Sequence, residues 1–305
     1  MLKNRLIAAL LLIVLVIPAA HADLPLTIEN LLTAEQRWRA DINVVYANSD
    51  RRNIDSLFTT LQLGPSQFIS VPVSVSQARQ NTDLLALSIG VRYGLSLKTE
   101  LYSRISAIGQ NTRTFGVNGA SDDSTQKFGD AWFGVNHRFS EDDATPALLG
   151  FAEVALAENV AAEGSELKYG KTGLLGITIY RVIDPLVLTL TTGYRYSAKV
   201  TVRDQRINSG DILFFNPGIA FAVNHKVTLT QGLQWRWQQR DQINGQSQGI
   251  FITQSKLALG IGYAWSKHTT VQIDSRADIT GNSGAEISMT VLYKFPSRFS
   301  GKHEH

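Results

Sequence analysis

Twelve segments of this chain alternate apolar and polar residues with a period of two. The clearest is residues 186–198. Leu188 and Leu190 fall on one of its faces, and Thr189 falls on the other. Successive side chains of a strand point to opposite faces, so the pattern predicts strands with one apolar and one polar face. The predicted strands are residues 37–48, 84–93, 98–108, 127–139, 147–158, 169–182, 186–198, 211–223, 226–240, 251–265, 270–280 and 286–295.

The connections between these strands alternate between short and long. Residues 94–96, 183–185, 224–225 and 266–267 are tight and 140–146 is moderate, whereas 110–126, 159–168, 199–209, 241–249 and 281–285 are mostly longer and polar. Outer-membrane barrels have short periplasmic turns, longer external loops and an even number of strands. The sequence therefore predicts an all-β fold, a transmembrane antiparallel up-and-down β-barrel of 12 strands with both chain ends in the periplasm.

Aromatic residues concentrate near the predicted strand ends, which is where the two surfaces of a membrane select them. Those expected at the periplasmic ends are Trp38, Tyr93, Phe139, Trp265, Tyr293 and Phe295, and those at the external ends are Tyr46, Tyr194, Tyr196, Trp235 and Trp237. In a soluble sandwich, large aromatics would more often lie in mid-strand. The distribution favours the membrane.

Residues 49–82 are too long and too apolar for an ordinary loop. Residues 56–63 and 67–76 read as strands joined by a turn at Gly64 and Pro65, and Pro72 weakens the second of them. A barrel of 14 strands is therefore the alternative to 12. With 12 strands, this segment forms an outer hairpin or folds into the lumen.

The N-terminus predicts export. Residues 1–22 combine Lys3 and Arg5, an apolar core and a small-residue site ending at Ala22, which is the pattern of a cleaved signal peptide. Residues 23–36 are expected to form a short periplasmic or plug helix, residues 37–295 the barrel, and residues 296–305 a periplasmic tail. The predicted location is the outer membrane of a Gram-negative bacterium.

Composition excludes several classes of protein. The 305 residues are 44% hydrophobic and 18% charged, and beyond the N-terminus no run approaches the ~18 apolar residues of a membrane helix. The absence of cysteine excludes disulfides, thiolate metal sites and cysteine nucleophiles. Of the 29 basic residues, Lys3 and Arg5 leave with the signal, so 29 − 2 = 27 face 26 acidic residues. This balance gives no support for nucleic-acid binding. No cofactor and no metal is predicted.

Charges of both signs occupy the predicted inward positions, beside glycine, serine, threonine and glutamine, so a polar and partly hydrated lumen is expected. The lumen-lining candidates are Arg39, Asp41, Arg92, Glu100, Arg104, Asp130, Arg138, Arg195, Arg236, Lys256, Asp274, Arg276 and Asp278. Two interpretations are open. The charges form ion pairs that brace the interior, or they line a permeation pathway, because rings of charge set pore selectivity.

Two motifs carry a family resemblance. Gly129-Asp130 with the run from Phe133 to Phe139 (FGVNHRF), and Asn216-Pro217-Gly218, resemble strands of the "MetA-pathway of phenol degradation" family. The resemblance implies an outer-membrane transport barrel, with some members encoded near aromatic-degradation genes. Fap-type amyloid exporters look similar, but they carry a longer N-terminal helical extension than residues 23–36.

The expected function is a porin-like channel for small solutes, with aromatic and other hydrophobic compounds as candidates. The alternatives are an export pore for an extracellular amyloid- or pilus-like polypeptide, a structural or adhesive barrel and, least favoured, a barrel hydrolase. An enzyme is not expected, because His137 has no serine two residues later on the same face. The expected partners are outer-membrane lipid and lipopolysaccharide, the barrel-assembly machinery through residues 286–295, and an unidentified solute or exported polypeptide.

Overall fold

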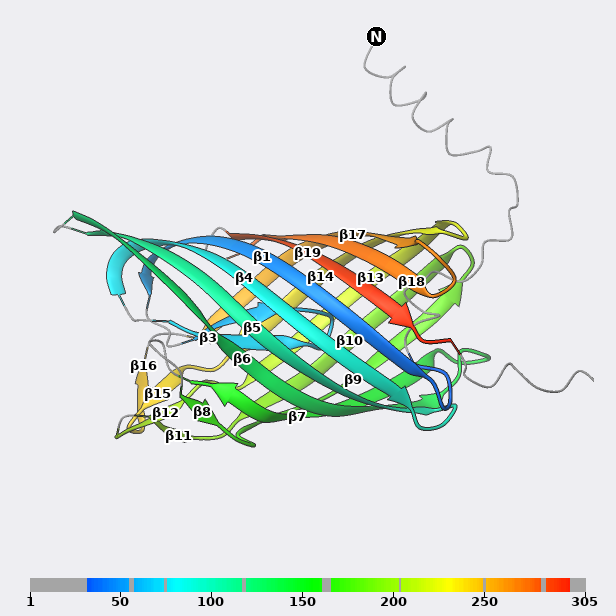
Figure 1. Cartoon of the computed structure of the whole chain (residues 1–305), viewed down its shortest axis with the longest axis horizontal. Coiled ribbons are helices and arrows are strands. Elements are labelled where there is room, and N and C mark those ends of the chain that lie inside the picture. Colours follow the sequence, from blue (N-terminus) through cyan, green and yellow to red (C-terminus); the bar gives the residue numbers. More distant parts are fainter. Residues whose placement is uncertain are drawn as a thin grey trace, which may run out of the picture.

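The computed structural model describes residues 32–54, 58–73, 76–116, 119–160, 166–202, 204–248, 251–280 and 284–296. Twelve long antiparallel strands form a tilted barrel (Figure 1). They are β1 (Trp38–Ile54), β4 (Ser76–Gly94), β5 (Thr99–Gly116), β6 (Gly119–Ser140), β7 (Ala147–Asn159), β9 (Thr172–Ile183), β10 (Leu186–Ser197), β13 (Ile212–Asn224), β14 (Val227–Gln238), β17 (Ile252–Ala264), β18 (Thr269–Asp278) and β19 (Gly284–Lys294).

The sheet closes on itself. The first and last barrel strands pair from Arg39 opposite Lys294 to Ser49 opposite Gly284, and β6 pairs with β7 to complete the ring. Each of the 12 strands therefore has a partner on both sides. Lipid offers no hydrogen-bond partner to a sheet edge, so closure is what a spanning sheet requires. The prediction of 12 strands is confirmed.

The alternative of 14 strands is wrong. The two extra candidates exist as β2 (Phe58–Gln62) and β3 (Phe68–Pro72), but these strands pair only with each other. The long connection between β1 and β4 turns inward at this point and leaves the wall continuous, with β1 directly beside β4. Figure 1 shows this light-blue hairpin between the near and far walls of the barrel.

The outward face of the barrel is apolar, as the alternation predicts. Ile42, Leu87 and Leu259 are each about half exposed on successive parts of the ring. Aromatic rings cluster near the short-turn end, where the Trp38 and Tyr93 ring centroids lie 4.7 Å apart. Polar residues also occur on this face. Gln231 is exposed between Ile219 and Leu259 on neighbouring strands, and nothing in the structure explains it.

Four short strands lie beyond the long-loop end of the wall. They are β11 (Val200–Val202), β12 (Gln205–Asn208), β15 (Asp241–Ile243) and β16 (Gln246–Gln248), which form a separate four-stranded sheet. A further short strand, β8 (Leu167–Lys168), pairs antiparallel with the end of β7 at Glu158 and Asn159. Two external loops therefore fold together rather than separately.

The structure describes only the last part of the segment before the barrel. The signal peptide 1–22, residues 23–31 of the predicted helix and residues 297–305 of the tail lie outside the described residues. Residues 32–36 are not helical, and Glu35 instead bridges to Gly94. Thr33 is buried and donates its backbone N–H to Glu100 inside the barrel, so this short segment enters the periplasmic end of the lumen. The part of the chain that is described contains no helix of the length and apolarity that a membrane crossing requires.

Candidate functional site: the lumen and its inward hairpin

The inward hairpin, β2 and β3 with their turn, is the central feature of the lumen. Its tight turn is closed by the Leu63 N–H, which donates to the Gln67 carbonyl at 2.8 Å, and by the Gln62 side-chain amide, which donates to the Pro65 carbonyl. Gly64 and Pro65 are residues that such turns favour. An eight-stranded barrel is filled by its own side chains, and 12 strands leave more room. The hairpin occupies that extra interior.

Wall side chains bind the polar groups of the hairpin. The donors come from five strands, and four of the five bonds end on a backbone carbonyl. Arg104 donates to Phe68 O at 2.9 Å, Arg195 to Ser70 Oγ at 2.6 Å, Asn216 to Pro65 O at 2.8 Å, Arg236 to Thr60 O at 2.7 Å and Arg276 to Gln62 O at 3.2 Å.

We call these five side chains the clamp. A two-stranded hairpin has two open edges whose carbonyls need partners, and a buried unpaired carbonyl is costly. Charged donors make the stronger kind of hydrogen bond. The clamp therefore stabilises the hairpin inside the barrel and gives the buried arginines a structural role.

Apolar contacts hold the hairpin on two sides. On the side of β1, β4 and β5, Leu61, Ile69 and Val71 of the hairpin pack in a buried cluster with wall residues that include Val45 and Leu84. On the opposite side, Phe68 packs in a second cluster whose wall residues are Trp132, Phe151, Ala155, Leu174 and Phe214. The lumen is thus less polar than the sequence predicts, because inward positions facing the hairpin are apolar.

A charged cluster occupies the periplasmic part of the lumen. Arg92 lies 3.2 Å from Asp41 and 3.0 Å from Glu100, and Arg39 lies 3.6 Å from Glu100. Asn136 also donates to Glu100, at 2.9 Å. The two cations and two carboxylates balance, which is how buried charges are tolerated.

A second cluster surrounds Trp132 at mid-height. The Trp132 indole N–H donates to Asp130 at 2.6 Å, and the Arg104 guanidinium lies 5.0 Å from the centre of the indole ring and 3.3 Å from Asp130. Tyr102 donates to Glu153 at 2.7 Å. A side chain at Gly134 would collide with the Tyr102 ring, since its Cβ would lie 2.5 Å from that ring, so the wall is glycine where the tyrosine lies flat.

A third cluster links β17, β18 and β19. Lys256 forms a short ion pair with Glu286 and lies 3.8 Å from Asp278, while Arg276 lies 3.7 Å from Glu286. Asp274 is nearby on β18, where it accepts two bonds from Gln272.

The structure places most of the predicted lining residues inside the barrel. Arg138 differs: it lies at the periplasmic rim, where it is partly exposed and pairs with Glu141 at 3.3 Å. Residues outside the predicted set also matter, above all Trp132 and Glu286. Glu286 follows the same inward alternation, so its register could have identified it. No pattern identified Trp132 as a centre of cation–π contacts.

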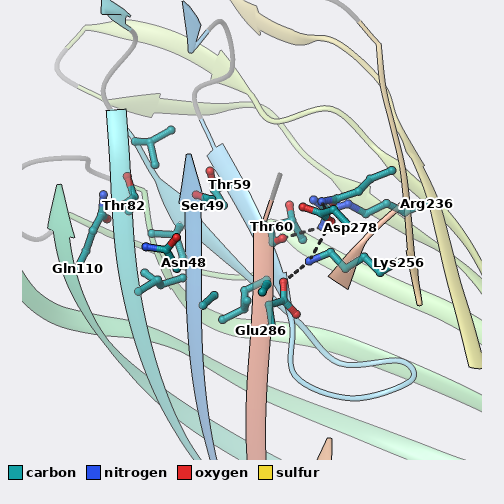
Figure 2. A pocket seen from close by; sticks show the side chains of 18 residues that line it. Asn48, Ser49, Thr59, Thr60, Thr82, Gln110, Arg236, Lys256, Asp278 and Glu286 are labelled. Carbon is teal, nitrogen blue, oxygen red and sulfur yellow. Dashed lines mark hydrogen bonds and ion pairs between the residues drawn. The ribbon is translucent and has the colours of Figure 1, made fainter. Parts of the chain in front are cut away.

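A cavity remains between the hairpin and the wall, with a volume of about 50 Å³. Its lining includes Thr60 and Leu61 from the hairpin and Lys256, Asp278 and Glu286 from the wall (Figure 2). Asn48, Ser49 and Thr82 also line it, near the external ends of β1 and β4. The hairpin therefore narrows the lumen without filling it completely.

The closed antiparallel wall, its apolar outward face and its charged interior are those of a bacterial outer-membrane β-barrel.

No family model matches the chain, and no curated protein sequence matches it. Solved structures of similar fold include the following two. An outer-membrane channel from Pseudomonas putida F1 is 14% identical, with 92% of this chain and 100% of that chain covered and a TM-score of 0.58. The translocator domain of the autotransporter NalP from Neisseria meningitidis is 10% identical, with 88% and 92% covered and a TM-score of 0.52. At these identities the likeness shows the fold alone.

Proposed function

We propose that this protein is an outer-membrane channel for small solutes, including aromatic and other hydrophobic compounds, and that the inward hairpin sets the size of what passes. The observation that carries the proposal is the hairpin itself. It is a segment of an external connection, folded into the lumen and bound there by five wall donors. A constriction made from a loop can be displaced without breaking the wall, because β1 and β4 pair directly.

The family resemblance supports the same proposal. The motifs at Gly129-Asp130 and Asn216-Pro217-Gly218 resemble those of the phenol-degradation family, and the Pseudomonas putida protein of similar fold is described as a channel. Inside the barrel, Asn216 of the second motif donates to the Pro65 carbonyl. The motif residue thus contacts the hairpin, which links the resemblance to the feature that narrows the lumen.

A polypeptide export pore is less well supported. An extended chain needs a continuous wide passage, whereas here the hairpin lies across the lumen between two apolar clusters. A structural or adhesive barrel would share the same wall, and only the conductance of the lumen separates it from a channel.

Single-channel recording in planar bilayers tests the proposal. The wild-type barrel should give small conductance steps, and a variant with residues 58–72 replaced by a short glycine–serine linker should give steps several-fold larger. Swelling of liposomes in small and large sugars provides the size limit. A silent wild type together with a silent linker variant, both inserted and folded, would contradict a channel.

A further inference from the structure

The cavity beside the hairpin has two chemically different walls. On one side Leu61 and Val71 of the hairpin and Leu84 of β4 present hydrocarbon. Another part of the lining carries Lys256, Asp278 and Glu286, which lie together in Figure 2. Gln254 also lines the cavity and donates to Asp278. A concave apolar site with a few convergent polar groups is the usual form of a small-molecule site.

The hydrogen bonds of the polar wall leave acceptors unused. Lys256 is held by Glu286 and Asp278, and the Gln254 amide N–H₂ donates to Asp278 at 2.6 Å. The buried Glu286 Oε2 and the Gln254 carbonyl oxygen have no hydrogen-bond donor among the described residues. The Arg276 guanidinium lies 3.7 Å from Glu286 Oε2, which is ion-pair distance but too long for a hydrogen bond. Two acceptors of the cavity lining, Glu286 Oε2 and the Gln254 carbonyl oxygen, are therefore unpaired among the described residues.

We propose that this cavity binds a small neutral alcohol, whose hydroxyl donates to Glu286 or Gln254 and whose compact hydrocarbon body packs on Leu61, Val71 and Leu84. The inference rests on the proposed function, because it names a class of solute that the channel would hold. An unpaired acceptor forms a hydrogen bond with a ligand that carries a donor, and it forms none with the carbonyl oxygen of a ketone.

The size of the cavity limits the ligand. A volume of 50 Å³ holds about three to five waters. At about 30 Å³ of liquid volume per water, displacing them frees about 90–150 Å³, which is room for roughly four to six non-hydrogen atoms. Cyclobutanol is a probe of this size and class. Cyclobutanone has the same ring and oxygen but no hydroxyl donor, so it is the matched comparison.

Protection of a single cysteine tests the site, since the chain contains no cysteine of its own. Thr82 lines the cavity, so Thr82→Cys in lipid nanodiscs should react with a small water-soluble maleimide more slowly when cyclobutanol is added. Cyclobutanone should need about a tenfold higher concentration for the same protection, because it leaves the acceptors unpaired. Ser266→Cys, at an exposed turn at the other end of the barrel, reports any general effect of the probes on labelling.

A matched pair of variants tests whether Gln254 contributes to the preference for the alcohol over the ketone. Gln254→Met in the Thr82→Cys background removes one free acceptor and should reduce the preference for the alcohol. Gln272→Met should leave it unchanged, because Gln272 also donates to an aspartate on its strand but does not line the cavity. Equal protection by both probes would overturn the alcohol class, and no protection by either would overturn the site.

The failure of this inference is distinguishable from failure of the channel proposal. Labelling is measured without any flux through the pore. A barrel that conducts but shows no protection retains the channel and loses the site. A barrel that shows alcohol-selective protection but never conducts retains the site and loses the channel.

Discussion

The outward and inward faces of the barrel are built by alternate residues of the same strands, yet they follow different rules. Outside, the membrane-spanning positions meet hydrocarbon, and most of them are apolar, as Ile42 and Leu87 are. Inside, the neighbour varies from place to place. Val45 meets the hairpin and is apolar, while Arg39 on the same strand meets Glu100 and is charged. A uniform solvent imposes a simple pattern, and specific contacts do not.

The largest effect is expected inside, at the apolar side of the hairpin. Leu61→Asp places an unpaired carboxylate in a buried cluster, at a cost of several kcal/mol. Because the wall pairs without the hairpin, we expect the hairpin to leave the lumen while the barrel stays folded. Conductance should rise several-fold, with unchanged mobility of the folded band in unheated gels. Leu61→Met keeps the side-chain volume and should resemble the wild type. If the Leu61→Asp variant does not fold into a barrel at all, the wall depends on the hairpin, and the prediction is wrong.

A charge on the outward face should destabilise the wall and leave the hairpin in the lumen. Leu87 lies midway along β4, so Leu87→Arg should cost about 2–4 kcal/mol, the range found for arginine at the bilayer midplane. Urea titration of the barrel folded into vesicles measures it. Leu97→Arg makes the same substitution at a periplasmic turn and should cost about 0–1 kcal/mol. Equal costs at both positions would argue against lipid around Leu87.

Removing one side chain of the clamp should have a smaller effect than Leu61→Asp or Leu87→Arg. Arg236→Met removes a charged donor from Thr60 O, a bond worth about 1.5–3 kcal/mol. Brief openings of larger conductance should become more frequent, without the permanent opening expected on removal of the hairpin. Arg138→Met removes an arginine from the rim and serves as the control. If both variants open equally often, the clamp does not restrain the hairpin.

The smallest effect is expected on ion selectivity. Arg92→Gln removes one positive charge from the periplasmic cluster, at a side chain that is 16% exposed, so the reversal potential in a salt gradient should shift modestly toward cations. Asp130→Asn should leave the reversal potential unchanged, because Asp130 is enclosed by Arg104, Ser106 and Trp132. A shift with Asp130→Asn and none with Arg92→Gln would exchange the two roles.

The two faces also differ in how much of them the sequence could predict. Alternation identified all 12 wall strands. The pleat places residues such as Leu85, Leu87 and Ile89 on one face of the strand, and contact with lipid requires that face to be apolar. Within residues 49–82, Gly64 and Pro65 predicted a turn between two short strands. Whether that hairpin joins the wall, projects outward or folds inward depends on donors spread from Arg104 to Arg276. No local pattern contains that information.

The same limit applies to the candidate site. Inward charges were predictable from register, but their partners were not, since Arg104 is bound to Phe68 O and Asp130 as well as lying over Trp132. The 13 candidate residues remain predictions as lining of a permeation path. Glu286 follows the inward register of the predicted closing strand, but no local pattern shows that it pairs with Lys256, which lies two strands away on β17.

The position of the hairpin is tested most directly by labelling intact cells with a bulky, membrane-impermeant maleimide. Thr60→Cys places a thiol on the hairpin at a residue that is only 3% exposed, and Ser124→Cys places one on the exposed external part of β6. The inward hairpin predicts rapid labelling of Ser124→Cys and labelling of Thr60→Cys only after denaturation. Equal rates at the two positions would contradict it, because residues 58–72 would then lie outside the barrel.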